Sequence, residues 1–256
     1  MLSSHFRPKK SYELIRVGPK EIGGFIFEKI AFEKCDILLS FGIASDISCE
    51  IDFFKKKNVK IHCYDHTISR RSWNTDIFIK SIFLIISTLM LKFNKTRYYH
   101  LGIKNLFQII NFYNNKKVKF FFEAVGYGKY GVSFKKTISR ASSRNICLKI
   151  NIEHSEYRIL DEIIKYKNKI GCLVIEFHDI DIHKHLVEKF IKKLEFTLVH
   201  VAVSGADYSG KNIPSAITVA LSKYKKITSN SANYPNKYDH KVEKKNKFLI
   251  DLAKSI

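Results

Sequence analysis

The sequence predicts a doubly wound α/β fold, with a mostly parallel sheet covered by helices on both faces and an antiparallel pair of strands at its end. Short apolar runs alternate with longer segments whose apolar residues recur at helical spacing, which is the pattern of successive βαβ units. The last two apolar runs are instead joined by a polar loop, which favours an antiparallel pair. Helices on both faces follow from the crossovers of a parallel sheet.

The length and composition indicate one domain. With 256 residues and 45% hydrophobic residues, the chain is long enough for one substantial core. We expect a single domain over 1–256, with an N-terminal extension over 1–32 and a polar tail over 228–256. The five cysteines lack CxxC spacing and the first residues lack an apolar signal-peptide core. Both features predict a reduced, cytoplasmic protein.

The first half of the chain contains the first strands of the predicted sheet. We expect strands over 36–41, 59–64 and 97–101, a helix over 46–57 with Asp46 as its N-cap, and a turn or strand over 111–122. The run 77–91 is apolar except for a few polar residues such as Lys80. A bilayer-spanning helix needs about 20 apolar residues, and this run is shorter. We therefore expect a core helix, with contact with a membrane surface as the alternative.

The second half shows a clearer alternation. We expect helices over 133–141, 156–166 and 181–194, and strands over 146–152, 171–177, 196–203 and 217–222. The helix over 181–194 has the strongest pattern, because its apolar residues form one stripe and lysines follow at its end.

The stretch from Asp36 to Asp65 contains the features of a cofactor cleft. Ligands of such sheets bind beyond the carboxyl ends of the strands. Gly42 follows the first strand and permits a tight turn with close backbone approach, and Asp65 follows the second strand. A carboxylate about 20 residues past the first turn can accept hydrogen bonds from a ribose. The alternative is that both residues serve ordinary turns.

The ends of two later strands contain the candidate catalytic residues, which would act on a substrate bound beside the cofactor. Asn151 lies at the end of one predicted strand and Glu153 follows it, while Glu176 lies at the end of the next strand and His178 follows it. His178 is the first choice for a general base, because the ordinary pKa of histidine lies near neutrality, and Glu153 is the second. The alternative is that both residues orient loop backbone. The ligands are too few to predict a metal site.

Five blocks, in this order and spacing, resemble the FkbM-type methyltransferases. The blocks are SFGIASDISCE (40–50), CYDHT (63–67), YYHLGI (98–103), LKINIEHSEYRIL (148–160) and LVIEFH (173–178). The segments 198–221 and 233–239 are similar to later parts of one branch of the family. The resemblance implies a Rossmann-like fold of the class I methyltransferase type, S-adenosyl-L-methionine as cofactor, and O-methylation of a saccharide or small-molecule hydroxyl.

The resemblance also implies the site residues. Cofactor contacts fall on Gly42, Ile43, Asp46, Glu50, Asp65 and His66. The acceptor hydroxyl falls near Asn151, Glu153, Glu176 and His178.

The sequence departs from the family pattern at two positions. Asn151 stands where the family has Asp, and His154 stands where it has Gly. Asn cannot act as a base, so a catalytically inactive scaffold or partner subunit is an alternative function.

The charge allows a further alternative. There are 45 Lys and Arg residues against 24 Asp and Glu, a net charge of +21. This charge favours an anionic partner such as an acidic glycan, a membrane surface or a nucleic acid, and a nucleic-acid-binding methyltransferase is the second alternative. A lysine-rich composition from an AT-rich coding sequence would give the same charge.

Overall fold

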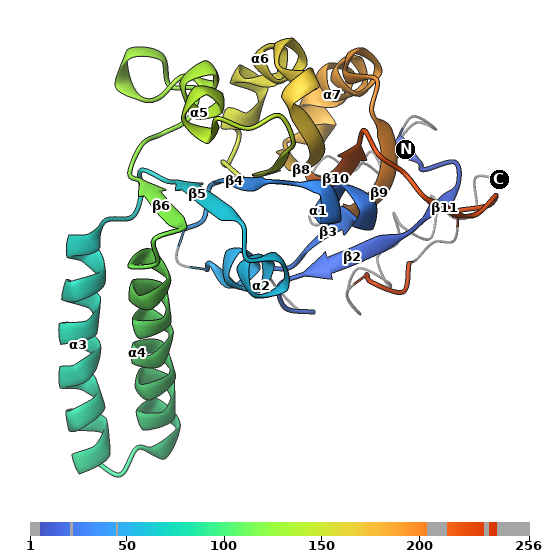
Figure 1. Cartoon of the computed structure of the whole chain (residues 1–256). Helices are drawn as coiled ribbons and strands as arrows, with labels where there is room; N and C mark the ends of the chain where they lie inside the picture. Colours follow the sequence, from blue (N-terminus) through green and yellow to red (C-terminus); the bar gives the residue numbers. More distant parts are fainter. Residues whose placement is uncertain (1–5, 21–22, 45, 204–213, 233–235, 240–256) are drawn as a thin grey trace.

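The computed structural model describes residues 6–20, 23–44, 46–203, 214–232 and 236–239 (Figure 1). Its central sheet has seven strands in the order β6-β5-β4-β7-β8-β10-β9. Their bounds are β4 (Ile37–Phe41), β5 (Lys60–Tyr64), β6 (Val118–Phe121), β7 (Ile146–Ile150), β8 (Ile170–His178), β9 (Thr197–Val203) and β10 (Ala216–Ser222). β4, β5 and β7 are five residues long and, apart from Lys60 at the start of β5, entirely buried, as expected for central strands of a parallel sheet.

The pairing of the strands confirms the predicted fold class. β4 pairs in parallel with β5 and β7, and the outer pairs β5–β6 and β7–β8 are also parallel. β10 is antiparallel to both of its neighbours, β8 and β9, which is the predicted antiparallel pair at the end of the sheet. In chain order the strands run 3-2-1-4-5-7-6, so the order reverses between β4 and β7. This is a doubly wound, Rossmann-like sheet with a switch in strand order at β4 and β7.

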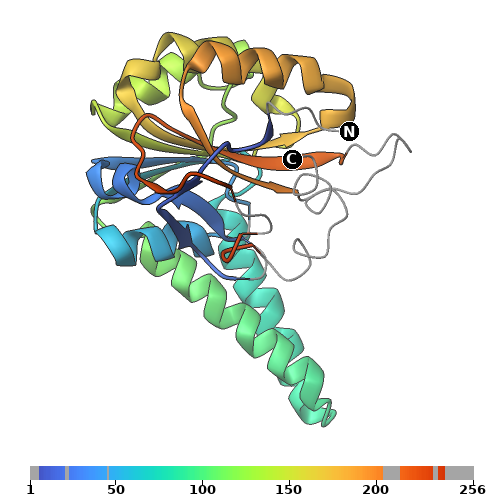
Figure 2. The same ribbon diagram turned by 90° about the vertical axis from the view of Figure 1, so that its right-hand side faces the viewer.

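Helices cover both faces of the sheet (Figures 1 and 2). One face carries α5 (Phe134–Ala141), α6 (Leu160–Lys165) and α7 (Ile180–Leu194), and the other carries α1 (Lys29–Lys34) and α2 (Ser48–Lys57). Alternate residues of β4 enter different cores, since Leu39 packs with the first group and Leu38 with the second. The predicted apolar stripe of α7 faces the first core through Val187, Phe190 and Leu194.

The N-terminal residues form two small antiparallel ribbons. β2 (Leu14–Val17) pairs with β3 (Phe25–Glu28), and β1 (Ser11–Tyr12) pairs with β11 (Ile227–Ser229) from the predicted tail. The β2–β3 ribbon contributes Leu14, Val17 and Phe27 to the second core. Parts of the predicted loop after β9 and of the predicted tail, including residues 204–213, 233–235 and 240–256, lie outside the described residues.

Two predictions for the segment after β5 are wrong. Residues 97–101 are not a strand but lie inside α4 (Phe93–Tyr113), because Tyr99, Ile103 and Leu106 recur at helical spacing and Tyr99 stacks on Phe83 of the preceding helix. The block that resembles a family strand and glycine therefore falls on a helix.

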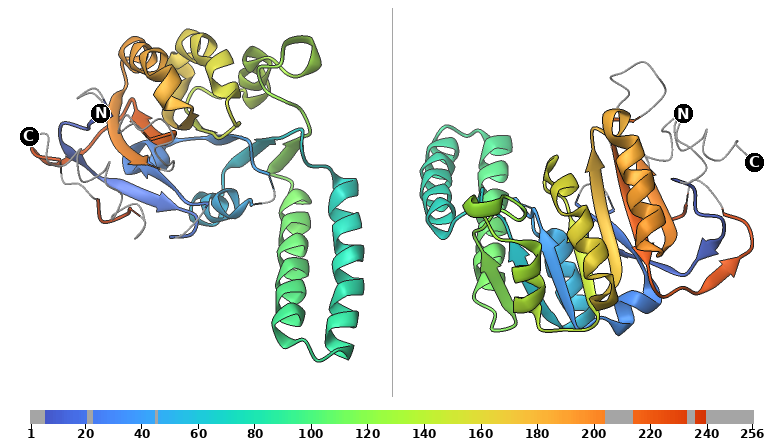
Figure 3. Two further views of the ribbon diagram at one scale, coloured as in Figure 1. Left: turned by 180° about the vertical axis from the view of Figure 1, so that it is seen from behind. Right: turned by 90° about the horizontal axis from the view of Figure 1, so that it is seen from above.

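The apolar run 77–91 is helical, but it is not a core helix. It belongs to α3 (Arg70–Leu89), which begins at a capping box on Ser69. α3 and α4 form a hairpin that projects from the sheet (Figures 1 and 3). Most apolar side chains of α3 are exposed, including Leu89 at 79%. None of the helices in the described residues is both long and apolar enough to cross a membrane.

Candidate functional site

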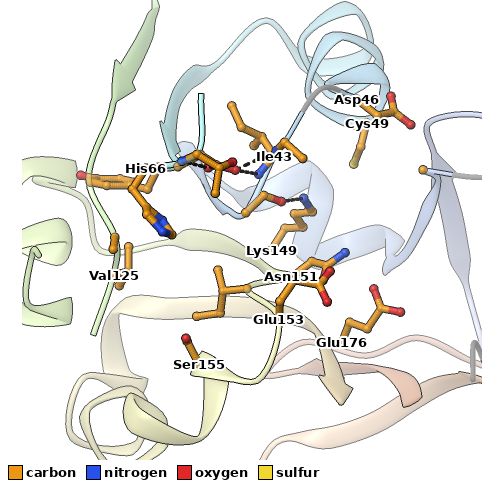
Figure 4. A pocket seen from close by; sticks show the side chains of 18 of the residues that line it. Ile43, Asp46, Cys49, His66, Val125, Lys149, Asn151, Glu153, Ser155 and Glu176 are labelled. Atoms are coloured by element: carbon orange, nitrogen blue, oxygen red, sulfur yellow. Dashed lines mark hydrogen bonds between the residues drawn. The ribbon is translucent and has the colours of Figure 1, made fainter. Parts of the chain in front are cut away.

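A cavity of about 800 Å³ lies at the carboxyl ends of β4, β5 and β7, where the strand order reverses (Figure 4). This is the ligand position expected for a doubly wound sheet, and the volume suits a small molecule. Eight of the ten predicted site residues line the cavity: Gly42, Ile43, Asp46, Asp65, His66, Asn151, Glu153 and Glu176. The remaining two, Glu50 and His178, lie behind its wall.

The turn after β4 is built around Gly42. This residue has a φ of +71°, and a Cβ placed on it would lie 1.5 Å from the backbone oxygen of Asn151. Only glycine fits such a close approach in the left-handed region. The N–H of Gly42 donates to Tyr64 O at 2.9 Å, and the N–H of Asn151 donates to Phe41 O at 2.9 Å. The turn is therefore tied to both neighbouring strands.

The carboxylate of Asp65 holds this turn from the end of β5. Oδ2 accepts from the N–H groups of Ile43 at 3.0 Å and Ala44 at 2.8 Å. Oδ1 accepts from the N–H of Thr67 at 2.7 Å and from its hydroxyl at 2.6 Å. Burial disfavours the charged carboxylate, but these hydrogen bonds outweigh it and lower the pKa of Asp65. All four acceptor positions are occupied, so a ribose hydroxyl would have to share them.

A buried ion pair supports the turn from below. Lys149, in the middle of β7, is almost fully buried, and its Nζ donates to Gly42 O at 2.7 Å. Its charge is balanced by Glu50 of α2, whose Oε1 lies 3.5 Å from Nζ and also accepts from the hydroxyl of Ser40. Glu50 is completely buried and does not line the cavity. Lys149 does line the cavity. It was not among the predicted site residues, although it is the one charged residue in the strand ICLKI.

Asn151 places an unpaired acceptor in the cavity wall. Its side-chain Oδ1 is buried and has no hydrogen-bond partner among the described residues. A buried polar atom without a partner costs free energy. This oxygen has almost no surface open to the cavity, so a ligand could pair with it only after the wall around it shifts.

The segment after β7 turns through two left-handed residues. Glu153 has a φ of +46° and His154 a φ of +71°, so His154 occupies the conformation that the family glycine would adopt without strain. The His154 side chain is more than half exposed and its Nδ1 lies 2.8 Å from Asp179 Oδ2. It does not line the cavity, whereas Glu153 does. The His154 side chain therefore does not fill the cavity.

His178 lies behind Glu153, between two carboxylates. Its Nδ1 is 3.2 Å from Oε1 of the buried Glu156, and its Nε2 is 3.4 Å from Glu153 Oε2. Burial lowers the pKa of an imidazole, but the hydrogen bond with Glu156 and the charges of Glu156, Glu176 and Glu153 outweigh it, so that the pKa of His178 is raised. A raised pKa and a position behind the wall favour a positioning role for this histidine.

Two further segments of the wall were missed. Residues 123–125 and Tyr127 follow β6, and residues 23–25 lead into the first residue of β3. His66 points into the cavity from the loop after β5, with its ring centroid 5.8 Å from that of Tyr127 (Figure 4). The first segment could have been predicted, because residues that follow a strand of such a sheet line its ligand cleft. Nothing in the sequence indicated that Phe25 from the N-terminal ribbon closes the cavity. The described residues contain no group of three or more His, Cys, Asp or Glu side chains that could hold a metal ion.

No protein-family model matches this sequence, and no curated protein matches it. The fold is similar to several solved structures. An rRNA methylase from Streptococcus thermophilus has 10% identity and a TM-score of 0.39, covering 76% of this chain and 92% of that one. An S-adenosylmethionine-dependent methyltransferase from Clostridium acetobutylicum has 8% identity and a TM-score of 0.38, covering 73% and 83%. A fibrillarin/Nop5p complex has 12% identity and a TM-score of 0.39, covering 84% and 92%. At these scores the function has to be inferred from the cleft itself.

Proposed function

We propose that this protein is an S-adenosyl-L-methionine-dependent methyltransferase, diverged from the FkbM type, that methylates a hydroxyl of a saccharide or small molecule. The observation that carries the proposal is the Gly42 turn. A glycine-only turn, fixed by Asp65 and opening on an 800 Å³ cavity at the switch in strand order, is a site for a nucleotide-like cofactor. The identity of that cofactor comes from the resemblance of the other four blocks, 40–50, 63–67, 148–160 and 173–178, to the family.

The residues of the cavity fit this cofactor chemically. The adenosine would lie on the side of Asp65 and His66, where Ala124 and Val125 offer apolar contact. The amino-acid end would approach Gly42, Ile43 and Asp46. Glu50 would balance the charge of Lys149 beneath the turn and would not make the cofactor contact that the resemblance implies.

The cofactor would supply an electrophilic methyl group on a sulfonium. The protein's own groups then have to orient the acceptor hydroxyl, take the proton of that hydroxyl and exclude water. Glu153 is the base in this proposal, because its carboxylate lines the cavity beside Glu176 and Asn151. His178 positions Glu153, because its Nε2 lies 3.4 Å from Glu153 Oε2. The carboxylate of Glu156 in turn holds His178, since its Oε1 contacts both the backbone N–H and the ring Nδ1 of His178.

Calorimetric titration of the purified protein with S-adenosyl-L-methionine tests the proposal. We expect saturable binding by the wild type and none by Gly42→Ala, with Ile182→Gln on the exposed side of α7 as the matched surface control. Glu153→Gln should keep the affinity and lose methyl transfer, measured with labelled cofactor and a panel of saccharides and small hydroxyl compounds. The absence of wild-type binding at millimolar cofactor would contradict the proposal.

The alternatives give different results in the same assays. For an inactive scaffold, the wild type does not bind the cofactor, and Asn151→Asp combined with His154→Gly creates affinity. For a nucleic-acid methyltransferase, RNA or DNA binds with a steep dependence on salt and serves as the methyl acceptor. Contact with an anionic membrane would involve a different surface, the α3–α4 hairpin.

A further inference from the structure

The α3–α4 hairpin exposes an apolar face that no described part of the chain covers. Helical spacing places seven apolar residues of α3 on one broad side of the helix, whose edge meets α4 where Phe83 stacks on Tyr99. These residues are Phe78, Ile79, Ile82, Phe83, Ile85, Ile86 and Leu89, each exposed by 42–79%. The hairpin projects beyond the sheet with α3 on its outer side (Figures 1 and 3). We call these seven residues the outer face of α3.

The contact between α3 and α4 is partly polar, whereas a helical hairpin in water normally buries apolar side chains between its two helices. The buried hydroxyl of Ser87 on α3 accepts a hydrogen bond from Thr96 Oγ1 on α4 at 3.2 Å. The side chain of Lys80 packs against Gly102, where an added Cβ would lie 3.2 Å from its Cδ. An amphipathic helix normally turns its apolar stripe toward its partner. α3 turns much of its apolar surface outward.

The apex of the hairpin extends this apolar surface. Met90, Leu91 and Phe93 are each more than half exposed. With the outer face of α3, they expose on the order of 1,000 Å² of apolar surface, against roughly 300–600 Å² for the largest patch on a typical monomer. A surface of this size indicates a partner that covers it.

The charge of the hairpin indicates the chemistry of that partner. Residues 70–113 contain seven Lys and Arg residues and a single acidic residue, Asp76. Three of the basic residues, Lys92, Lys95 and Arg97, are exposed next to the apex. This charge opposes the pairing of two copies through their hairpins and is complementary to anionic lipid headgroups. Long basic side chains can lie along an apolar surface and keep their charge at the headgroups.

We infer that the outer face of α3 and the hairpin apex dock on the surface of an anionic phospholipid membrane. The apolar side chains would enter the boundary between headgroups and acyl chains, as an interfacial helix does. The exposed Tyr98, beside Arg97, would lie at the headgroup level, where tyrosine is enriched. This surface is separate from the cleft, so the inference does not depend on the proposed cofactor.

Vesicle flotation with the full-length protein tests the inference. We expect wild-type protein to bind phosphatidylcholine vesicles that contain phosphatidylserine at least about tenfold more tightly than vesicles of phosphatidylcholine alone. The combined variant Phe78→Gln, Ile82→Gln, Ile85→Gln and Leu89→Gln should lose about tenfold or more of that affinity. Its unfolding midpoint should not fall, because the four positions are exposed. Ile182→Gln and Ile227→Gln, at exposed positions outside the hairpin, are the matched controls.

The same variants distinguish membrane docking from adsorption by charge alone and from pairing of two copies. Equal binding by the quadruple variant would mean that the overall charge alone adsorbs the protein, and would overturn the inference. The inference would also be overturned if light scattering without lipid showed a wild-type dimer and a monomeric quadruple variant, because a second copy would then cover the outer face of α3. Replacement of Lys92, Lys95 and Arg97 with Gln should remove most of the preference for phosphatidylserine, and an unchanged preference would also count against the inference.

Discussion

Replacing Asp65 with asparagine should release the Gly42 turn from the end of β5. The carboxylate accepts four hydrogen bonds, two on each oxygen. An amide has one oxygen, so the N–H groups of Ile43 and Ala44, or the two donors of Thr67, would lose their acceptor. Two hydrogen bonds to a charged group contribute roughly 3 kcal/mol or more when the group is buried. We expect Asp65→Asn to lower the free energy of unfolding by about that amount.

Asp46→Asn is the matched control. It is an aspartate in the same turn, and its Oδ1 accepts one exposed hydrogen bond, from the N–H of Ser48 at 2.9 Å. Loss of this hydrogen bond should lower the free energy of unfolding by less than about 1 kcal/mol. Urea unfolding followed by circular dichroism measures the stability of both variants. Equal effects of the two substitutions would refute the reasoning, because they would show that Asp65 does not hold the turn.

The pH dependence of stability gives a second check on Asp65. Its pKa in the folded protein is lower than its ordinary value. Such a group contributes stability that is fully present above the unfolded value of about 3.9, and loses it as the pH falls through the lower folded pKa. The difference in stability between wild type and Asp65→Asn should therefore be constant near neutral pH and shrink in acid. A difference that grew on acidification would contradict the assignment.

Three further predictions concern the turns and the histidine beside the cleft. Gly42→Ala should destabilise the protein by more than about 2 kcal/mol, because its Cβ would collide with Asn151 O; an unchanged urea midpoint would refute this. His154→Gly should be more stable than His154→Ala by about 1 kcal/mol, because only glycine relieves the left-handed strain, and equal midpoints would contradict it. The pKa of His178 is raised, so its contribution to stability should be fully present below its unfolded value of about 6.5 and be lost as the pH rises through the folded pKa. His178→Gln should then differ most from wild type at the acidic side of that window, and a difference that increases with pH would count against the Glu156 contact.

The turn after β4 could be predicted from the sequence because it depends on local rules. A buried strand followed by glycine, and a second strand followed by aspartate, place both residues at one edge of a parallel sheet. The structure places Gly42 and Asp65 there, in contact through the N–H groups of Ile43 and Ala44. The contact itself was not predictable, because sequence spacing does not show that all four acceptor positions of the carboxylate are used within the protein.

The positions of Glu50 and His178 could not be predicted, because they depend on neighbours far away in sequence. Glu50 is buried because Lys149 of β7 lies beside it, and a charge in a core needs such a partner. His178 follows Glu176 by two residues and should share its side of the strand. It is withdrawn from the cavity by Glu156, whose segment folds over the end of β8 after the left-handed residues Glu153 and His154.

The hairpin shows why an apolar sequence does not by itself predict burial. Residues 77–91 are apolar enough for a core helix, but whether a helix is buried depends on which element covers it, and α3 packs on α4 partly through Lys80 and Ser87. The hairpin also replaces the single crossover helix between β5 and β6, so that α3 starts at Ser69, four residues after Asp65. A membrane against the outer face of α3 would therefore lie at the β5–β6 side of the sheet, away from β7 and β8, which position Glu153 and Glu176.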